Sequence, residues 1–185
     1  NSFANFFLLN LFNAIICELI EEEFLISLEP KSNNFFLPWK KIQISDESED
    51  GKIITSNIEI PSHISFPLYN FLNYLCNEIN QIAGHTLPKG TLINLLIALS
   101  IELDKKYGNL FEQLEKSDYQ SNVKQIFALQ WYFDMQFVKQ FLNTSHNEQV
   151  KNEAVQLIHQ RMLTFESLID PFDLHVFFPH MQTTL

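Results

Sequence analysis

Apolar residues recur at helical spacing from about residue 67 to the end of the chain. Between Pro67 and about residue 83 they form the stripe of one amphipathic helix. The stripe consists of Leu68, Leu72, Leu75, Ile79 and Ile82. Gly84 is typical of a left-handed helix stop, and Thr86 followed by Pro88 is typical of a helix start. Two helices are therefore predicted to meet at a short corner.

Three further helices are predicted at about 88–107, 121–143 and 148–169. The first of them is apolar on nearly every side, so it should be covered on all faces or leave one face for a partner. Ser121 is a suitable cap for the second. Because the connections are short, consecutive helices should pack antiparallel. The sequence thus predicts an all-α fold, with an antiparallel helical bundle over 67–185.

The first 28 residues form a separate apolar segment. Residues 1–17 contain no charged side chain, but asparagines interrupt the apolar residues and four glutamates follow between 18 and 23. A spanning helix needs about 20 predominantly apolar residues, and a signal peptide needs a basic start, which is missing here. We therefore expect no transmembrane span, and instead a helix from about 4 to 27 that packs on the bundle.

Residues 29–66 are predicted to be a linker, because four prolines and an acidic run at 46–50 divide them into short pieces. The expected form is an irregular acidic loop. The alternative is a two-stranded hairpin, because isoleucines alternate loosely with polar residues in this segment. Any sheet should then be confined to about 35–60. The acidic run is typical of a solvated tip, and a dock for a basic partner is the second interpretation.

A tight corner is predicted near residue 170. Asp170 is a candidate N-cap, Pro171 fits the first helical position, and Asp173 fits a short capping box. Ile169 and Leu174 should staple the entry across the cap. Pro179 disfavours helical geometry at the preceding residue, so the last helix is expected to be truncated after about two turns.

Composition narrows the functional classes. Eighteen phenylalanines against four glycines favour long packed elements. A formal charge of −10 argues against a nucleic-acid partner, whose phosphates need Lys and Arg. Cys17 and Cys76 lie in apolar helical pattern without ligand spacing, so neither a disulfide framework nor a zinc site is expected.

The search for catalytic chemistry finds no anchoring residue. None of the six histidines has the i, i+4 spacing that lets two imidazoles hold one metal. His175 and His180 lie near Asp170 and Asp173, but capping explains both aspartates better than a metal does. Glycine-rich phosphate loops, nucleophile elbows and Cys–His pairs are missing from the sequence. We expect no enzyme, no cofactor and no catalytic, cofactor-binding or metal residue; an uncharacterised helical hydrolase is the rival from the enzyme class.

Two sequence stretches carry a family resemblance. Residues 75–89 read Leu-Cys-Asn-Glu-Ile-Asn-Gln-Ile-Ala-Gly-His-Thr-Leu-Pro-Lys, and residues 168–177 read Leu-Ile-Asp-Pro-Phe-Asp-Leu-His-Val-Phe. Together they resemble the carboxy-terminal region of subunit 1 of the conserved oligomeric Golgi complex. Ala83 departs from a glycine of the family pattern and His175 from an acid. The chain opens on Asn1, which suggests a fragment of a longer protein.

This resemblance implies a non-catalytic scaffold of the helical-rod type within an eight-subunit vesicle tether that acts in intra-Golgi retrograde transport. The implied partners are the sister subunits, together with membrane-fusion proteins and small GTPases. The implied location is the cytoplasmic face of the Golgi membrane, as a peripheral protein. The alternative is a helical adaptor or cargo-binding module of another exocyst-like tether.

Overall fold

The computed structural model describes residues 10, 14, 39–47, 51, 53–82, 87–143 and 148–184. The two strands are β1 (Lys40–Glu47) and β2 (Ile53–Ile60). Five helices follow: α2 (Phe66–Ile82), α3 (Lys89–Lys116), α4 (Ser121–Asn143), α5 (Glu148–Glu166) and α6 (Pro171–Thr184).

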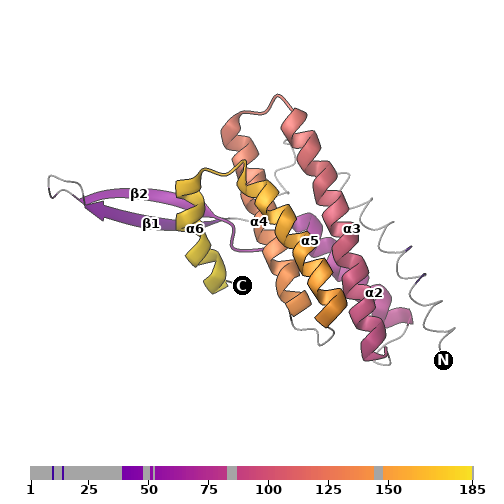
Figure 1. The fold of residues 1–185 in the computed structure, drawn as a ribbon. Coiled ribbons are helices and arrows are strands. Elements are labelled where there is room, and N and C mark those ends of the chain that lie inside the picture. Colours follow the sequence, from indigo (N-terminus) through magenta and orange to yellow (C-terminus); the bar gives the residue numbers. More distant parts are fainter. Residues whose placement is uncertain are drawn as a thin grey trace.

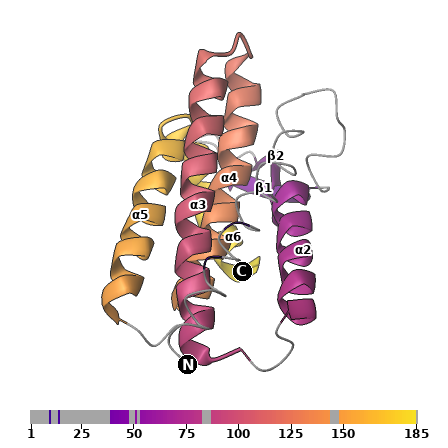
Figure 2. The same cartoon turned by 90° about the vertical axis from the view of Figure 1, so that its right-hand side faces the viewer.

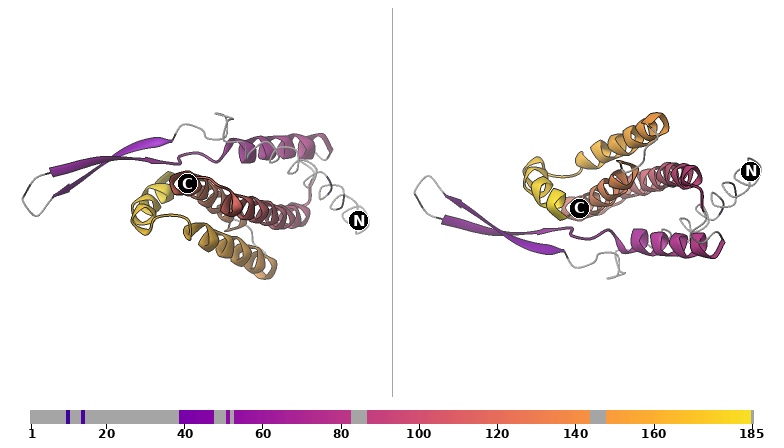
Figure 3. Two further views of the ribbon diagram at one scale, coloured as in Figure 1. Left: turned by 90° about the horizontal axis from the view of Figure 1, so that it is seen from above. Right: turned by 90° about the horizontal axis from the view of Figure 1, so that it is seen from below.

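Helices α2 to α5 lie alongside one another, and each runs opposite to the helix before it (Figures 1 and 2). The hairpin of β1 and β2 projects from one end of this bundle, and α6 lies at the same end (Figures 1 and 3). The all-α bundle and its antiparallel order are therefore confirmed.

The core of the bundle is largely aromatic where α3, α4 and α5 meet. Trp131 of α4 lies between Tyr107 of α3 and Phe165 of α5, with ring centroids 6.2 and 5.7 Å away. Phe127 and Phe111 extend the cluster at 5.6 Å from Trp131 and 5.9 Å from Phe165. These tilted and edge-on arrangements are the ones that aromatic quadrupoles prefer. Aromatic rings thus fill the centre of this core.

Helix α3 is longer than predicted, because it continues from residue 107 to Lys116. Its extra turns carry Leu110, Phe111 and Leu114, all buried, in the same stripe as Leu103 and Tyr107. The helix ends where the Ser117 hydroxyl donates to the carbonyl of Leu114 at 2.5 Å. Packing of this stripe outweighs the low helix propensity of Gly108 in its middle.

The other helix boundaries follow the pattern closely, although one cap differs. The predicted bounds 121–143 are those of α4, and α5 ends three residues before the predicted 169. Gln120, not Ser121, takes the cap position of α4, since its carbonyl accepts from the N–H groups of Val123 and Lys124 at 3.0 and 3.1 Å.

The predicted irregular linker contains a regular hairpin, so the two-stranded alternative is the correct one. Eight residues of each strand pair in an antiparallel register, from Lys40 opposite Ile60 to Glu47 opposite Ile53. One face carries Lys40 and the isoleucines of both strands except Ile53. On this face the half-buried pair of Ile42 and Ile58 packs against the core. Gly51 in the connection has φ of +72°, a conformation that glycine adopts without strain. The alternation of isoleucine and polar residues is therefore a strand signal that outweighs the prolines around it.

Helix α6 begins as predicted but does not stop at Pro179. The Asp170 carboxylate accepts from the N–H of Phe172 at 2.8 Å, which is the geometry of an N-cap. Ile169 is buried and Leu174 packs on the core, as a staple requires. Asp173 accepts a hydrogen bond from Gln125 of α4 rather than closing a capping box. Its carboxylate therefore ties the two helices together.

The helix continues to Thr184 with Pro179 inside it, so the expected truncation is wrong. Proline removes one hydrogen bond and crowds the preceding turn, but its fixed φ is compatible with a helix. Phe177 and Met181 lie on either side of the proline and are both buried. Their packing outweighs the local penalty.

Several predictions fall on residues outside the described part of the chain. The helix from about 4 to 27 is described only at Asn10 and Ala14, which are helical and exposed. Gly84 and Thr86 at the first corner and the acidic positions 48–50 are likewise outside it.

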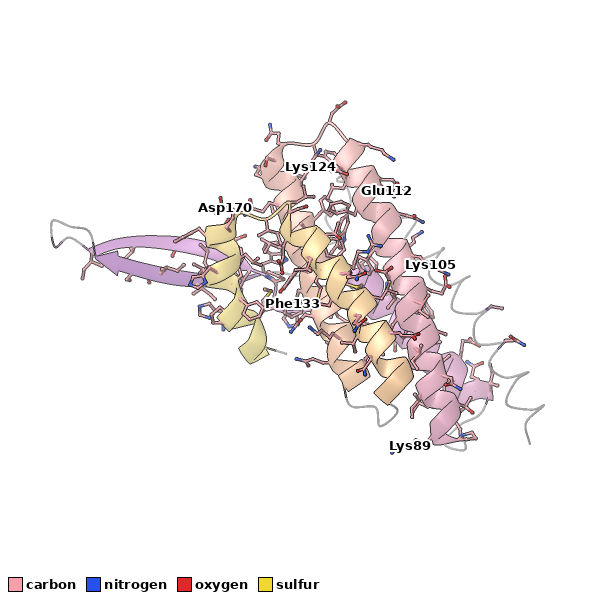
Figure 4. All side chains as sticks on the ribbon, in the orientation of Figure 1. Lys89, Lys105, Glu112, Lys124, Phe133 and Asp170 are labelled. Carbon is pink, nitrogen blue, oxygen red and sulfur yellow. The ribbon has the colours of Figure 1, made fainter. Side chains whose placement is uncertain are left out.

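We predict that Asp170→Ala lowers the free energy of unfolding by about 1 kcal/mol, because the substitution leaves the N–H of Phe172 without its acceptor. Figure 4 shows Asp170 at the start of α6. Asp170→Asn is the matched control, since its amide oxygen keeps the cap. Urea denaturation followed by circular dichroism measures both; equal stability of the alanine variant and the wild type would contradict the cap.

Candidate interaction surface

A buried polar cluster joins the hairpin, α2 and α3 to α4. Asp134 of α4 is 0% exposed. One of its carboxylate oxygens accepts from the backbone N–H of Ser65 at 2.8 Å and from the Gln130 amide at 3.1 Å. The other oxygen accepts from the hydroxyl of Tyr107 at 2.6 Å. Since Ser65 directly precedes α2, the carboxylate fixes the start of that helix.

Gln130, one turn before Asp134, extends the cluster to the base of the hairpin. Its amide oxygen accepts from the indole N–H of Trp39, next to β1, at 3.0 Å. Its amide nitrogen donates to the carbonyl of His63, in the segment after β2, at 2.9 Å. Both ends of the hairpin are thus bound to one glutamine side chain, and this contact sets the direction in which the hairpin leaves the bundle.

Burial raises the pKa values of the acidic groups in this cluster. Removal from water raises the pKa of Asp134 from 3.8 to about 6, and the hydrogen bonds from Tyr107, Ser65 and Gln130 offset part of that increase. Burial, followed by the nearby charge of Asp134, raises the pKa of Tyr107 well above its usual value. The carboxyl group therefore changes protonation near pH 6, well above the usual range of an aspartate.

An ion pair fixes α5 on α3. The Arg161 guanidinium donates to both oxygens of Asp104, at 2.8 and 3.3 Å. It passes so close to Gly108 that a Cβ there would lie 2.7 Å from Nη2. Gly108 therefore makes room for the pair, which explains a glycine in the middle of a long helix.

The outward face of α6 is largely apolar, with His175 as its polar residue. Its exposed residues are Pro171, Phe172, His175, Phe178 and Pro179, and Phe172 is 68% exposed. At about 100° per residue these five positions share one side of the helix, opposite the buried Phe177 and Met181. A helix with apolar residues on both sides is normally covered by other protein.

The residues of metal and thiol chemistry do not assemble into a site. Across the described ranges there is no group of three or more His, Cys, Asp or Glu side chains that could hold a metal ion. Cys76 is an exposed free thiol, whereas Cys17 lies outside these ranges. None of the helices in the described part of the chain is long and apolar enough to cross a membrane.

Sequence reasoning missed the polar cluster and the ion pair. Gln130 and Asp134 interrupt an apolar stretch of α4 four residues apart, and this spacing places them on one helical face. Asp104 and Gly108 show the same spacing on α3. Polar residues within an otherwise buried helix were the signal available in the sequence.

The fold and these contacts define a helical-bundle module with a projecting hairpin, joined by buried polar contacts. The sequence comparisons add a particular similarity. The chain is 35% identical over 151 residues, 80% of its length, to the conserved oligomeric Golgi complex subunit 1 of Homo sapiens. It is 34% identical over the same length to the Mus musculus protein of that name and 28% identical over 147 residues to the Drosophila melanogaster one.

These matches confirm the resemblance that the motifs at 75–89 and 168–177 indicate. The chain spans about 15% of the length of the human and mouse proteins. No family model matches it. No solved structure matches it either.

The pKa of Asp134 leads to a prediction about pH. Because the folded-state pKa is raised from 3.8 to about 6, the folded state binds the proton more tightly. This group's stabilisation is therefore complete below pH 4 and is lost as the pH rises through 6. We expect wild type to lose on the order of 2–3 kcal/mol relative to Asp134→Asn between pH 4 and 7. Denaturant titrations across that range measure the difference, and parallel pH profiles would contradict it.

A second prediction concerns Gly108. Gly108→Ala should destabilise the wild type by about 2 kcal/mol, because the added methyl group displaces Arg161 from Asp104. In the Asp104→Asn, Arg161→Leu background, Gly108→Ala should raise the free energy of unfolding by up to about 1 kcal/mol, because alanine has a higher helix propensity than glycine. Thermal and urea unfolding of the four proteins give the sign in each background. The same sign in both would remove the steric explanation.

Proposed function

We propose that this chain is the carboxy-terminal part of a subunit of a Golgi vesicle-tethering complex and acts there as a non-catalytic scaffold. The observation that carries the proposal is the similarity to subunit 1 of the conserved oligomeric Golgi complex over 80% of the chain. The described residues of the stretches 75–89 and 168–177 lie in α2, α3 and α6 or directly precede α3 and α6.

The partners that we propose are sister subunits of the same complex. Exposed apolar side chains occur on every helix of the bundle and on α6, and they supply the kind of surface that helix-mediated contacts use. The formal charge of −10 supports a protein partner rather than a nucleic acid. Membrane-fusion proteins and small GTPases are further candidate partners, in intra-Golgi retrograde transport.

We place the main subunit contact on the outward face of α6. This helix forms the end of the bundle, where its exposed phenylalanines and prolines have no covering element among the residues described. Its orientation is fixed by the Asp170 cap and by the bond from Gln125 to Asp173. A rigid apolar face at the end of a bundle is suited to continue a helical rod into a neighbouring subunit.

The proposed location is the cytoplasmic face of the Golgi membrane, with peripheral attachment through the assembly. The similarity to a Golgi complex subunit supports this location. A helical adaptor or cargo-binding module of another tether is the alternative, and it differs in the partners that the chain would recover.

Co-purification with each sister subunit in turn tests the proposal. The wild-type chain should recover at least one of them. Phe172→Asp should reduce that recovery at least tenfold, because a charge in an apolar contact loses its hydration. Its melting temperature should stay unchanged, since the side chain is 68% exposed.

Leu163→Asp on α5 is the matched control, because Leu163 is 50% exposed on a different face of the molecule. Equal recovery by Phe172→Asp and wild type would disprove the contact on α6 alone. Failure of the wild-type chain to recover any sister subunit would disprove the proposed function.

A further inference from the structure

Helices α2, α3 and α4 surround an apolar pocket of about 180 Å³. Its lining includes Leu72 and Cys76 of α2, Leu92 and Leu96 of α3, and Phe137 and Leu142 of α4. The single hydroxyl in the lining belongs to Ser100 and is bound to the carbonyl of Leu96 at 2.8 Å. The pocket therefore offers no polar group to a ligand.

The pocket is not closed by the elements around it. Leu92 is 41% exposed and Cys76 is exposed at its edge. The sequence predicted that α3 would be covered on all faces or leave one face for a partner, and Leu92 is the exposed leucine on this helix while Leu95, Leu99 and Leu103 are buried. An apolar pocket left open in this way requires an occupant with large apolar side chains.

The amino-terminal segment of the same chain has the matching chemistry. Residues 1–17 carry no charge and are rich in phenylalanine, leucine and isoleucine. Asn10 and Ala14 are helical and exposed. For the helix that the sequence predicts over about 4–27, a spacing of about 100° per residue puts Phe12 opposite Asn10 and Ala14 in the pattern, with Leu8 and Ile15 beside Phe12. A predicted helical side that carries these apolar residues needs an apolar surface to cover it.

The volume of the pocket and the length of the connecting chain both fit the amino-terminal segment as its occupant. An engineered cavity of about 150 Å³ accepts benzene, so a pocket of about 180 Å³ has room for a phenylalanine ring. The hydrogen bond from Trp39 to Gln130 holds residue 39 beside α4. The pocket reaches Leu142 on the same helix. At 1.5 Å per residue, Leu142 lies about 18 Å from Gln130 along the helix axis. The chain from Phe12 to Trp39 spans about 40 Å even as a continuous helix, so the connection is long enough.

We propose that the pocket between α2, α3 and α4 is the docking site of the amino-terminal segment of the same chain, with Phe12 inserted and Leu8 and Ile15 at its rim. The segment completes the bundle as a further helix and covers the open face of α3. This contact is formed within one chain, so it holds or fails independently of the proposed tethering function.

Cysteine pairing tests the docking in the 185-residue chain. In a Cys17→Ser background, cysteine is introduced singly at Leu8, Phe12 or Ile15, with Cys76 at the pocket as the partner thiol. A disulfide forms only where the Cα atoms come within about 7 Å. We expect at least one of these three variants to form an intramolecular disulfide under mild oxidation at least ten times faster than the controls. Asn10→Cys and Ala14→Cys are the matched controls from the opposite side of the helix.

Non-reducing electrophoresis and mass spectrometry separate the outcomes. Disulfide-linked dimers in place of intramolecular bonds would overturn the proposal in favour of a second copy as occupant. Equal, slow oxidation of all five variants would overturn it in favour of a different occupant. As a second measurement, Phe12→Asp should lower the melting temperature by several degrees while Asn10→Asp leaves it unchanged; equal melting temperatures would also contradict the docking.

Discussion

Two side chains on one turn of α4, Gln130 and Asp134, hold the architecture together. Gln130 binds the residue before β1 and the segment after β2, and Asp134 binds the start of α2 and the Tyr107 hydroxyl of α3. Apolar packing alone is not directional, so it would leave the orientation of a projecting hairpin open. Hydrogen bonds in a dry interior have defined geometry and are strong there, and these bonds therefore select one arrangement.

This arrangement has a cost that the rest of the core must offset. A buried carboxyl group prefers its neutral form, which is why the pKa of Asp134 rises to about 6. Around it, the aromatic cluster of α3, α4 and α5 supplies extensive apolar burial, with Tyr107 belonging to both groups. One residue thus connects the polar cluster, which gives direction, to the aromatic core, which gives most of the stability. We infer that the polar cluster is retained for specificity of arrangement rather than for stability.

The sequence predicts the helical elements well because their signal is local and repeated. Periods of apolar residues fixed the bounds of α4, and the cap at Asp170 required only three neighbouring residues. What local patterns could not provide were contacts between distant segments. The bond between Trp39 and Gln130 spans 91 positions, and the close passage of Arg161 over Gly108 depends on how α5 lies on α3. Pro179 was misjudged for the same reason, since the burial of Phe177 and Met181 is a tertiary effect.

The distribution of rigid and open surfaces follows from these contacts. Helices α3, α4 and α5 share one interior that the aromatic rings fill. The buried polar cluster bonds α3 to α4, and the ion pair of Asp104 and Arg161 bonds α3 to α5. Away from it, the pocket lined by Leu92 and the outward face of α6 are mostly apolar. Apolar surfaces accept a partner by shape and area, and a neighbouring rigid core keeps that shape constant before the partner arrives. The segment 168–177, one of the two stretches that carry the family resemblance, joins the two kinds of surface. Ile169 is buried in the core, while Phe172, three residues later, faces solvent.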